Sequence, residues 1–353
     1  MTKTTKSTLI TIGIALAFYL VAEILLQTGS LSSLLQGLLV PLCTYVILAV
    51  SLNLTVGVLG ELSLGHAGFM CVGAFAGAFF SVCTKGVITP DGLRFFLALL
   101  IGAAVAALFG ILIGIPVLRL RGDYLAIVTL AFGEIIKNII NALYVGRDGR
   151  GFAFSLKDTA GLHLDSDGQL LIKGAQGITG TPHDATFTVG IVLVIVSLLI
   201  VLNLMHSRAG RAIMAIRDNR IAAESLGIGV TKYKIMAFSI SAALAGAAGV
   251  LYAHNLSTLT ALPKNFGYNM SILILVFVVL GGMGNMRGSM IAAIILTLLP
   301  ELLRSFSERR MLIYSIVLIA LMIYNWSPKV QVWKEKNRAF FRARNPFLKR
   351  VNK

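Results

Sequence analysis

Long apolar runs separated by short polar stretches make up most of this chain. An apolar run of about 18 residues or more is typical of a helix that crosses a membrane. Together with shorter runs near the C-terminus, the pattern predicts ten membrane-spanning helices. Their approximate bounds are Leu9–Leu26, 34–56, 67–83, Leu93–Leu118, Tyr124–Tyr144, Phe187–Met205, 239–254, 271–280, 289–303 and 311–326. We therefore predict an all-α, polytopic transmembrane bundle over residues 1–326.

The composition agrees with a polytopic membrane protein. Of 353 residues, 57% are hydrophobic and 13% are charged, whereas soluble domains are about a quarter charged. The net charge is +16, and three segments (1–8, 206–234 and 327–353) contribute 14 of those charges. Cationic segments beside membrane spans stay in the cytoplasm. The charge thus places both termini and the 206–234 loop on the cytoplasmic side, and it argues against nucleic acid as a partner.

Small residues recur at intervals of four within two of the predicted spans. Such stripes allow helix backbones to approach closely, so they predict a tightly packed bundle. The residues are Gly102, Ala106, Gly110 and Gly114 in the fourth span, and Ala242, Ala245, Gly246 and Gly249 in the seventh.

The loop 206–234 is the longest polar interruption in the second half of the chain. Within it, IAAESLG predicts a short helix that begins after Asn219 as the N-cap and ends at Gly227 in a left-handed conformation. Ala222 lies on its small-residue face, and Ala223 keeps the neighbouring surface flat. A helix of this kind can fit into a groove of another protein. The alternative is an ordinary amphipathic connector on the inner leaflet.

The motif AAESLG followed by an apolar helix is similar to the EAA-type motif of ABC importer permeases, the loop that docks on the ATPase. The longer segment GRAIMAIRDNRIAAESLGIGVTKYKIMAFSISAALAGAAGVLYAH resembles LivM-type permeases of branched-chain amino-acid importers. The resemblance extends over essentially the whole chain. It implies that the residues which couple the permease to the ATPase are Arg217, Asp218, Asn219, Ala222, Ala223, Glu224 and Gly227.

The resemblance also implies an assembly and a location. A permease of this type would work with a second, homologous permease subunit, two cytoplasmic ATPase subunits and a periplasmic substrate-binding protein in the bacterial inner membrane. Within the class, urea or short-amide importers have similar permeases. An autonomous secondary transporter or channel is the alternative from another class, although it would have no need of an ATPase-docking loop.

The segment GVLGELSLGHAGF places four glycines between two apolar runs, at 57, 60, 65 and 68. Irregular backbone at membrane depth is tolerated only where it is buried in protein or lines a cavity. Its polar groups are Glu61, Ser63 and His66. The segment is either a tight cytoplasmic turn with a capping serine or part of the translocation pathway. LSLGHAGF resembles a hallmark segment of the LivM type, and on the pathway interpretation Ser63, Gly65 and His66 are the candidate residues.

A second glycine cluster, Gly281, Gly282 and Gly284, interrupts the apolar run after residue 270. It predicts either a broken or re-entrant helix whose backbone lines a cavity, or a tight turn between two spans. On the first interpretation the three glycines belong to the pathway and the chain has eight or nine spans. On the second it has ten.

Glu134 is a carboxylate about ten residues, or roughly 15 Å, into the fifth predicted span. An intramembrane carboxylate is a functional candidate by default, so Glu134 is included in the candidate pathway. Lys137, three residues later, lies on the same helix face and offers a structural ion pair instead. We expect the structural role, because ion pairing between packed spans is commoner than proton coupling in an ATP-driven pump.

Two polar segments flank the predicted spans. Residues 145–186 form a long insertion of nearly balanced charge, which suits the external side and either a docking surface for a binding protein or a mobile tether. Residues 327–353 interleave aromatic and basic side chains. That composition is typical of a cytoplasmic segment on anionic membrane lipids.

The sequence offers no chemistry of its own. It contains no GxxxxGK[ST] phosphate-binding loop, no nucleophile–base pattern and no metal-ligand cluster. Cys43, Cys71 and Cys83 have no paired spacing. We therefore expect no catalytic residue, no metal and no cofactor bound by this chain, with ATP used by partner subunits.

Overall fold

A computed structural model describes residues 3–29, 32–120, 122–148, 151–162, 168–304 and 309–326. The chain divides into two compact units, Met1–Ile294 and Ile295–Lys353, and each is described by itself. The basic segment 327–353, predicted to lie on membrane lipids, is outside the described residues.

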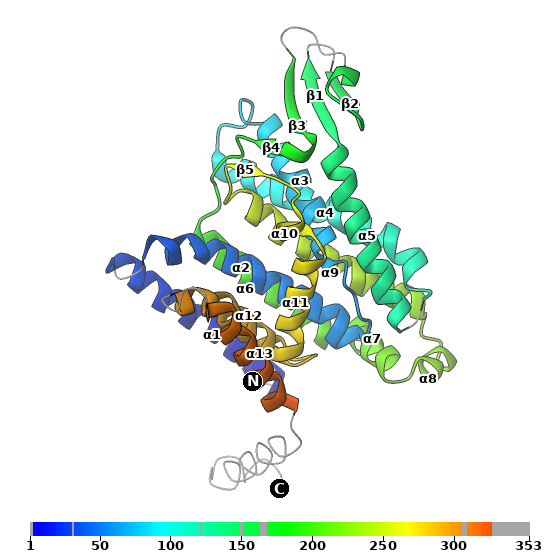
Figure 1. The fold of residues 1–353 in the computed structure, drawn as a ribbon. Helices are drawn as coiled ribbons and strands as arrows, with labels where there is room; N and C mark the ends of the chain where they lie inside the picture. Colours follow the sequence, from blue (N-terminus) through cyan, green and yellow to red (C-terminus); the bar gives the residue numbers. More distant parts are fainter. Residues whose placement is uncertain are drawn as a thin grey trace, which may run out of the picture. The chain divides into compact units, whose positions relative to one another are not determined.

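The described residues are mainly helical (Figure 1). The helices are α1 (Lys3–Gln27), α2 (Ser33–Asn53), the π-helix η1 (Leu54–Leu59), α3 (His66–Cys83), α4 (Asp91–Val117), α5 (Asp123–Ala142), α6 (Phe187–His206), α7 (Arg208–Asp218), α8 (Arg220–Ser225), α9 (Val230–Ala253), α10 (Pro263–Phe266), α11 (Tyr268–Gly281), α12 (Met286–Leu302) and α13 (Arg310–Trp326).

Eight helical segments in the described part of the chain are long and apolar enough to cross a membrane. Among them, η1 continues α2 without a break and α10 precedes α11 closely, so that each pair counts once. The last two predicted runs correspond to α12 and α13, which have 17 residues each. The prediction of an all-α, polytopic bundle is confirmed, and its range of eight to ten spans includes the number found.

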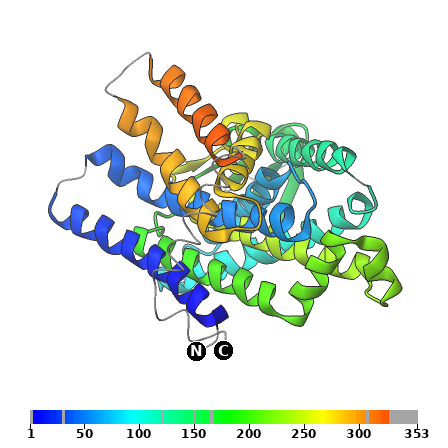
Figure 2. The same cartoon turned by 90° about the horizontal axis from the view of Figure 1, so that it is seen from below.

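The helix α2 with its extension η1 is the most deeply buried span of the first unit, with 94% of its apolar window buried. It contacts α6, α9 and α11, and it runs from the edge of this unit into its middle in both views (Figures 1 and 2). The sequence Ser33–Leu59 has no charged residue. Its buried hydroxyl groups bond to carbonyls of the helix itself, as Thr44 Oγ1 does to Val40 O (3.2 Å), so burial leaves those groups paired.

Glycines bring α3, α4 and α9 into backbone contact, as the small-residue stripes predicted. A Cβ built on Gly102 would lie 2.8 Å from the carbonyl oxygen of Gly73, and one built on Gly246 would lie 2.7 Å from that of Gly102. A Cβ on Gly110 would lie 2.7 Å from the Cβ of Ala242. Real Cβ atoms do not approach backbone this closely, so larger residues would force the three helices apart.

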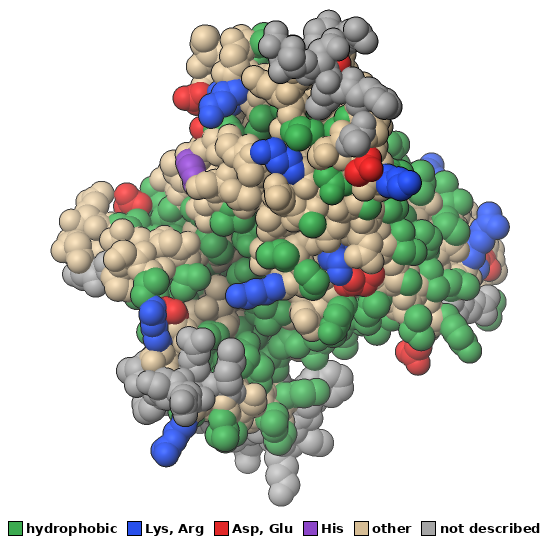
Figure 3. Space-filling view, turned by 45° about the horizontal axis from the view of Figure 1, so that its top comes forward, with side chains coloured by type: hydrophobic (Ala, Val, Ile, Leu, Met, Phe, Trp, Pro, Cys, Tyr) green, Lys and Arg blue, Asp and Glu red, His purple; other side chains and the backbone are tan. Residues whose placement is uncertain are grey.

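The outward faces of the spans are apolar. Leu100, Leu108 and Leu112 of α4, for example, are 48%, 61% and 63% exposed. Hydrophobic side chains cover much of the face shown in Figure 3, with few charged side chains among them. Exposed apolar surface on this scale is what a bilayer covers.

The insertion 145–186 is folded in its described part, and its strands were not predicted. Strands β1 (Tyr144–Asp148), β2 (Gly151–Ser155) and β3 (Gln169–Lys173) form an antiparallel sheet in the order β2-β1-β3. After the short 3-10 helix at Gly174–Gln176, β4 (Ile178–Thr179) pairs with β5 (Thr258–Leu259). The sheet marks one end of the first unit, called here the sheet end, and α7 and α8 mark another, called the α8 end (Figure 1).

Candidate coupling element and translocation site

The loop 206–234 contains two helices where one was predicted. At the start of α7, Ser207 Oγ accepts a hydrogen bond from the amide of Gly210 (3.1 Å). At the start of α8, Asn219 Oδ1 accepts one from the amide of Ala222 (3.0 Å). These bonds satisfy amides that have no partner within their helices. The predicted N-cap at Asn219 is confirmed.

The end of α8 has the predicted left-handed glycine. Gly227 has φ +79°, and its amide donates to the carbonyl of Glu224 (3.0 Å). The next amide, of Ile228, donates to the carbonyl of Ala223 (3.1 Å). This pair of bonds is a Schellman motif, which ends a helix and reverses the chain. Asn219 and Gly227 thus fix α8 as a separate six-residue element.

Ala223 was predicted to form part of the surface of the short helix, and this position is wrong because the residue is buried. Ala223 is 2% exposed and packs with Ile216 of α7 and Val230 of α9. The short helix needs one apolar side facing the protein, and Ala223 supplies it. The exposed side of α8 is formed by its neighbours: Ala222 is exposed, and Ile221 and Leu226 are each 80% exposed.

The charged side chains of this element pair with each other on the surface. Arg220 Nε lies 3.0 Å from Glu224 Oε1, and Arg217 Nη2 lies 2.9 Å from Asp218 Oδ1. Exposed pairs of this kind contribute little to stability, about 0.5 kcal/mol each. Between them and the end of η1 lies a pocket of about 490 Å³. Its lining combines the charged side chains above with Leu59, Gly60, Glu61 and Lys234.

Two side chains of the 206–234 segment reach the glycine-rich segment 57–68. Arg217 Nη1 donates to the carbonyl oxygen of Gly57 (3.1 Å). Lys234, in the first turns of α9, forms an ion pair with Glu61, and both side chains are largely buried. The residues of each pair are more than 150 positions apart in sequence, so no local pattern indicated either contact.

The segment 60–65 is a non-helical break between η1 and α3, in which Ser63 and Gly65 are buried, Gly60 is exposed and the other residues are half-buried. The amide of Leu64 donates to Thr129 Oγ1 of α5 (3.0 Å), and the amide of Ala67 donates to Ser271 Oγ of α11 (3.1 Å). A Cβ on Gly68 would lie 2.7 Å from Cα of Gly133. Side chains of neighbouring spans therefore satisfy its backbone, which is the condition for irregular structure at membrane depth.

The polar candidates of this break differ in their surroundings. His66 begins α3 and is fully enclosed, with Nε2 2.7 Å from Ser51 Oγ. Ser63 is 1% exposed, and its hydroxyl has no hydrogen-bond partner. Gly65 lies against the backbone of Thr129, with no room for a side chain. None of the three caps a solvent-exposed turn. Their role in a pathway stays a prediction.

The second glycine cluster is a tight turn that packs on the first. Gly282 (φ +94°) and Gly284 (φ +80°) take left-handed conformations between α11 and α12. Asn53, at the end of α2, accepts a hydrogen bond from the amide of Gly284 (2.7 Å) and donates one to Ser289 Oγ (2.7 Å). A Cβ on Gly57 would lie 2.8 Å from Cα of Gly284. The two candidate segments thus form one site, with Asn53 between them.

Glu134 makes the contact that its spacing predicted. Its Oε2 forms an ion pair with Lys137 Nζ, and its Oε1 accepts a hydrogen bond from the amide of Tyr268, the first residue of α11 (2.7 Å). The second contact was not predicted, because it joins residues 134 positions apart. Glu134 therefore neutralises the buried Lys137, and it accepts a hydrogen bond from an amide at the N-terminus of a neighbouring span, where such amides have no partner within the helix.

The sequence of this chain matches a known protein family. Residues 34–324 match the model of the family described as "Branched-chain amino acid transport system / permease component". The chain belongs to this permease family. All the candidate residues described above lie within the matched range.

Several characterised relatives are similar to this permease. It is 37% identical over 294 residues to the high-affinity branched-chain amino acid transport system permease protein LivM of Salmonella typhimurium, and equally to that of Escherichia coli. Each alignment covers 81% of this chain and 67% of the relative. A nucleoside ABC transporter permease, NupC of Lactococcus lactis, is 24% identical over 75% of this chain and 84% of its own length. No solved structure matches significantly.

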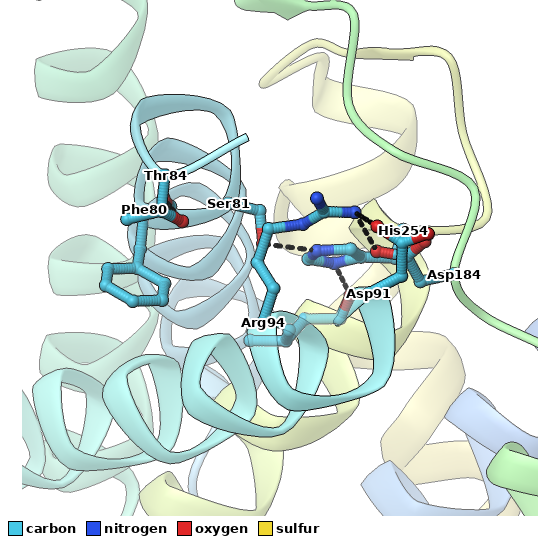
Figure 4. Close-up of polar contacts among 8 residues, drawn as sticks. Phe80, Ser81, Thr84, Asp91, Arg94, Asp184 and His254 are labelled. Carbon is cyan, nitrogen blue, oxygen red and sulfur yellow. Dashed lines mark hydrogen bonds and ion pairs between the residues drawn. The ribbon is translucent and has the colours of Figure 1, made fainter. Parts of the chain in front are cut away.

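At the sheet end, the permease has a group of polar side chains from four segments (Figure 4). Arg94 of α4 is 4% exposed, and its Nη2 lies 2.7 Å from Asp91 and 3.0 Å from Asp184, which precedes α6. His254, just beyond α9, has its Nε2 2.7 Å from Ser81 Oγ of α3. The cluster fastens the polar connector before α6 to the ends of three helices. No pattern in the sequence predicted these contacts.

Burial lowers the pKa of His254, which is fully enclosed. The Val250 carbonyl, 2.9 Å from Nδ1, and the carboxylate of Asp184 act in the opposite direction, while Arg94 adds to the lowering. The lowered pKa indicates a neutral imidazole in the folded permease near neutral pH.

Within the described residues, no group of three or more His, Cys, Asp or Glu side chains is arranged to hold a metal ion. The three cysteines are free thiols.

Proposed function

We propose that this chain carries branched-chain amino acids (leucine, isoleucine and valine) across a bacterial inner membrane as one of two homologous permease subunits of an ABC importer. The observation that supports this most is the 37% identity to two LivM permeases over 81% of the chain. Matches to the more distant nucleoside permease reach only 24% identity.

The proposed importer includes two ATPase subunits, which dock on α8. This helix offers an exposed apolar pair, Ile221 and Leu226, beside the small side chain of Ala222. Exposed apolar residues on a capped polar element are typical of a protein interface. The ATPases hydrolyse ATP, while this chain binds no cofactor and catalyses no reaction itself.

In the proposed orientation the α8 end faces the cytoplasm. The loop 206–234 has a net positive charge, as membrane insertion favours for cytoplasmic loops. The start of α1 belongs to the same end, since Arg287 Nε beside the glycine turn donates to Thr11 Oγ1 (2.6 Å). Both termini are then cytoplasmic, with residues 327–353 on anionic lipids. The sheet end faces the periplasm and receives the substrate-binding protein.

The proposed pathway passes the paired glycine segments, 57–68 and 281–284. An apolar amino acid needs polar contacts there but no strong uncompensated charge. Backbone groups, the unpartnered hydroxyl of Ser63 and the enclosed imidazole of His66 supply polarity of that kind. The nearest carboxylate, Glu61, is neutralised by Lys234.

Uptake of labelled substrates tests the proposal. A strain deleted for this gene is compared with the same strain complemented, using leucine, isoleucine, valine and urea at equal concentrations. We expect the deletion to lower uptake of the three amino acids and to leave urea uptake unchanged. Loss of urea uptake alone would support a urea or short-amide importer. Leucine uptake that persists after removal of the ATPase subunits would identify an autonomous transporter instead.

A further inference from the structure

Arg217 occupies a position between the docking helix and the glycine-rich break. It lies in the last turn of α7, two residues before the N-cap of α8. Its guanidinium is shared: Nε and Nη2 donate to Asp218 Oδ1 (3.0 and 2.9 Å), and Nη1 donates to the carbonyl oxygen of Gly57 (3.1 Å). Its aliphatic stem lies over Gly60, where a Cβ would be 2.6 Å from Arg217 Cγ.

The surrounding geometry gives α8 room to move relative to the break. The pocket of about 490 Å³ separates Leu59, Gly60 and Glu61 from the side of α8 that carries Arg220 and Glu224. The guanidinium of Arg217 crosses this gap by hydrogen bonding, and the Lys234–Glu61 ion pair does so at the start of α9. The helix α7 also packs against η1, so a displacement of α7 can reach the break through this packing and through the hydrogen bond of Arg217.

The carbonyl group of Gly57, which accepts the hydrogen bond from Arg217, lies in a part of the backbone that can shift. Gly57 lies in the π-helix η1, near its C-terminal end, where carbonyl groups outnumber the amides that can bond to them. Such π-helical segments are common at functional sites. Gly57 also touches Gly284 of the second glycine turn. A shift at the Gly57 carbonyl therefore reaches both candidate pathway segments at once.

We propose that Arg217 is a positioning residue that transmits movement of the ATPase-docking helix to the paired glycine segments. This inference rests on the proposed function, because it takes α8 as the ATPase contact. It assigns Arg217 a role in transmission rather than in docking, because Nη1 and the aliphatic stem contact Gly57 and Gly60 of the glycine-rich break.

The first test compares Arg217→Met with Arg211→Met in the complete importer, reconstituted with its ATPases and binding protein. Methionine keeps an apolar stem over Gly60 and removes every donor. Arg211 lies on the same helix, but its guanidinium bonds only to the nearby carbonyl of His206 (3.1 Å). We expect Arg217→Met to retain its ATPase subunits and to lose about tenfold in uptake per ATP hydrolysed, the effect of one charge-assisted hydrogen bond. Arg211→Met should transport normally.

A second variant perturbs the same contact from the other side and keeps the docking helix native. Gly60→Ala would push the Arg217 stem away, and it also places alanine at φ +81°. The control is Gly122→Ala, whose backbone (φ +59°, ψ −135°) is even less favourable for alanine but whose new methyl group would meet open space. We expect Gly60→Ala to be uncoupled like Arg217→Met, and Gly122→Ala to stay coupled.

Hydrogen exchange of the amides in 57–65 supplies a readout that needs no substrate. With ATP, exchange in this segment should change in the wild-type complex and stay constant in Arg217→Met. The inference is wrong if both variants couple ATP to uptake as their controls do, or if Arg217→Met loses its ATPases. Absence of amino-acid uptake by the wild-type complex would instead refute the proposed function, and the exchange measurement would still decide the role of Arg217.

Discussion

Glu134→Gln is the sharpest test of the ion pair in α5, because it changes charge and little else. Glutamine has the shape of glutamate, and its Oε1 can still accept the hydrogen bond from the amide of Tyr268. What is lost is the negative charge opposite Lys137, whose side chain is 7% exposed. The substitution therefore leaves a buried ammonium group without a counter-charge.

The expected cost follows from this burial. Removing one partner of a buried pair costs about 3–5 kcal/mol. Glu134 itself is 26% exposed, so the pair is only partly buried, and we expect the lower limit, about 3 kcal/mol. The double variant Glu134→Gln/Lys137→Met removes both charges and should recover most of the loss, since no unpaired ion remains. Glu301→Gln is a matched control: it pairs with Arg304 at the same spacing, but that arginine is 54% exposed. It should cost about 0.5 kcal/mol.

The assay is thermal unfolding of each purified variant in detergent, together with leucine uptake per folded complex. Glu134→Gln should have the lowest melting temperature of the four proteins, with uptake per folded complex near that of wild type. The structural interpretation fails if Glu134→Gln melts with the Glu301→Gln control. A normal melting temperature combined with a large loss of uptake would instead assign Glu134 to gating.

Three further predictions concern packing, docking and pH. Gly73→Ala should lower the melting temperature in detergent, with an overpacking cost of about 3 kcal/mol, because its methyl group would meet the backbone of α9. The control Gly13→Ala, which has nothing within 4 Å of the new methyl group, should leave the melting temperature unchanged. Equal melting temperatures of the two variants would refute the packing argument. Ala222→Trp, on the exposed face of α8, should insert normally but fail to co-purify with the ATPases, and retention of ATPases with normal uptake would show that α8 is not the docking site. The pKa of His254 is lowered in the folded protein, so below about pH 6.5 the unfolded chain binds a proton at this residue that the folded chain does not. Protonation then destabilises the folded state, and the melting temperature should fall from pH 7 to pH 5 less steeply in His254→Gln than in wild type. Parallel curves for the two proteins would contradict this.

Features set by neighbouring residues could be predicted from the sequence. The cap at Asn219, the left-handed Gly227 and the pairing of Glu134 with Lys137 all depend on residues within a few positions of one another. The small-residue stripes predicted close helix packing, because they report what a helix face can accommodate. The apolar runs predicted each spanning helix, since the length of a bilayer span is fixed by membrane thickness.

Features that join distant segments could not be predicted. The Arg217–Gly57, Lys234–Glu61 and Asn53–Ser289 contacts connect helices whose order around the bundle no local pattern specifies. The burial of Ala223 depended on contact with α7, a helix that was not predicted. The strands of the insertion were missed as well, since each has five residues or fewer and is stabilised by pairing across the sheet.

The glycine contacts among α3, α4 and α9 restrict how this permease can change shape. Where backbone meets backbone, no side chain can switch rotamer to absorb a displacement. These three helices must therefore travel together as one rigid block during a transport cycle. Alternating access in this protein would then consist of movements of other segments relative to this three-helix block.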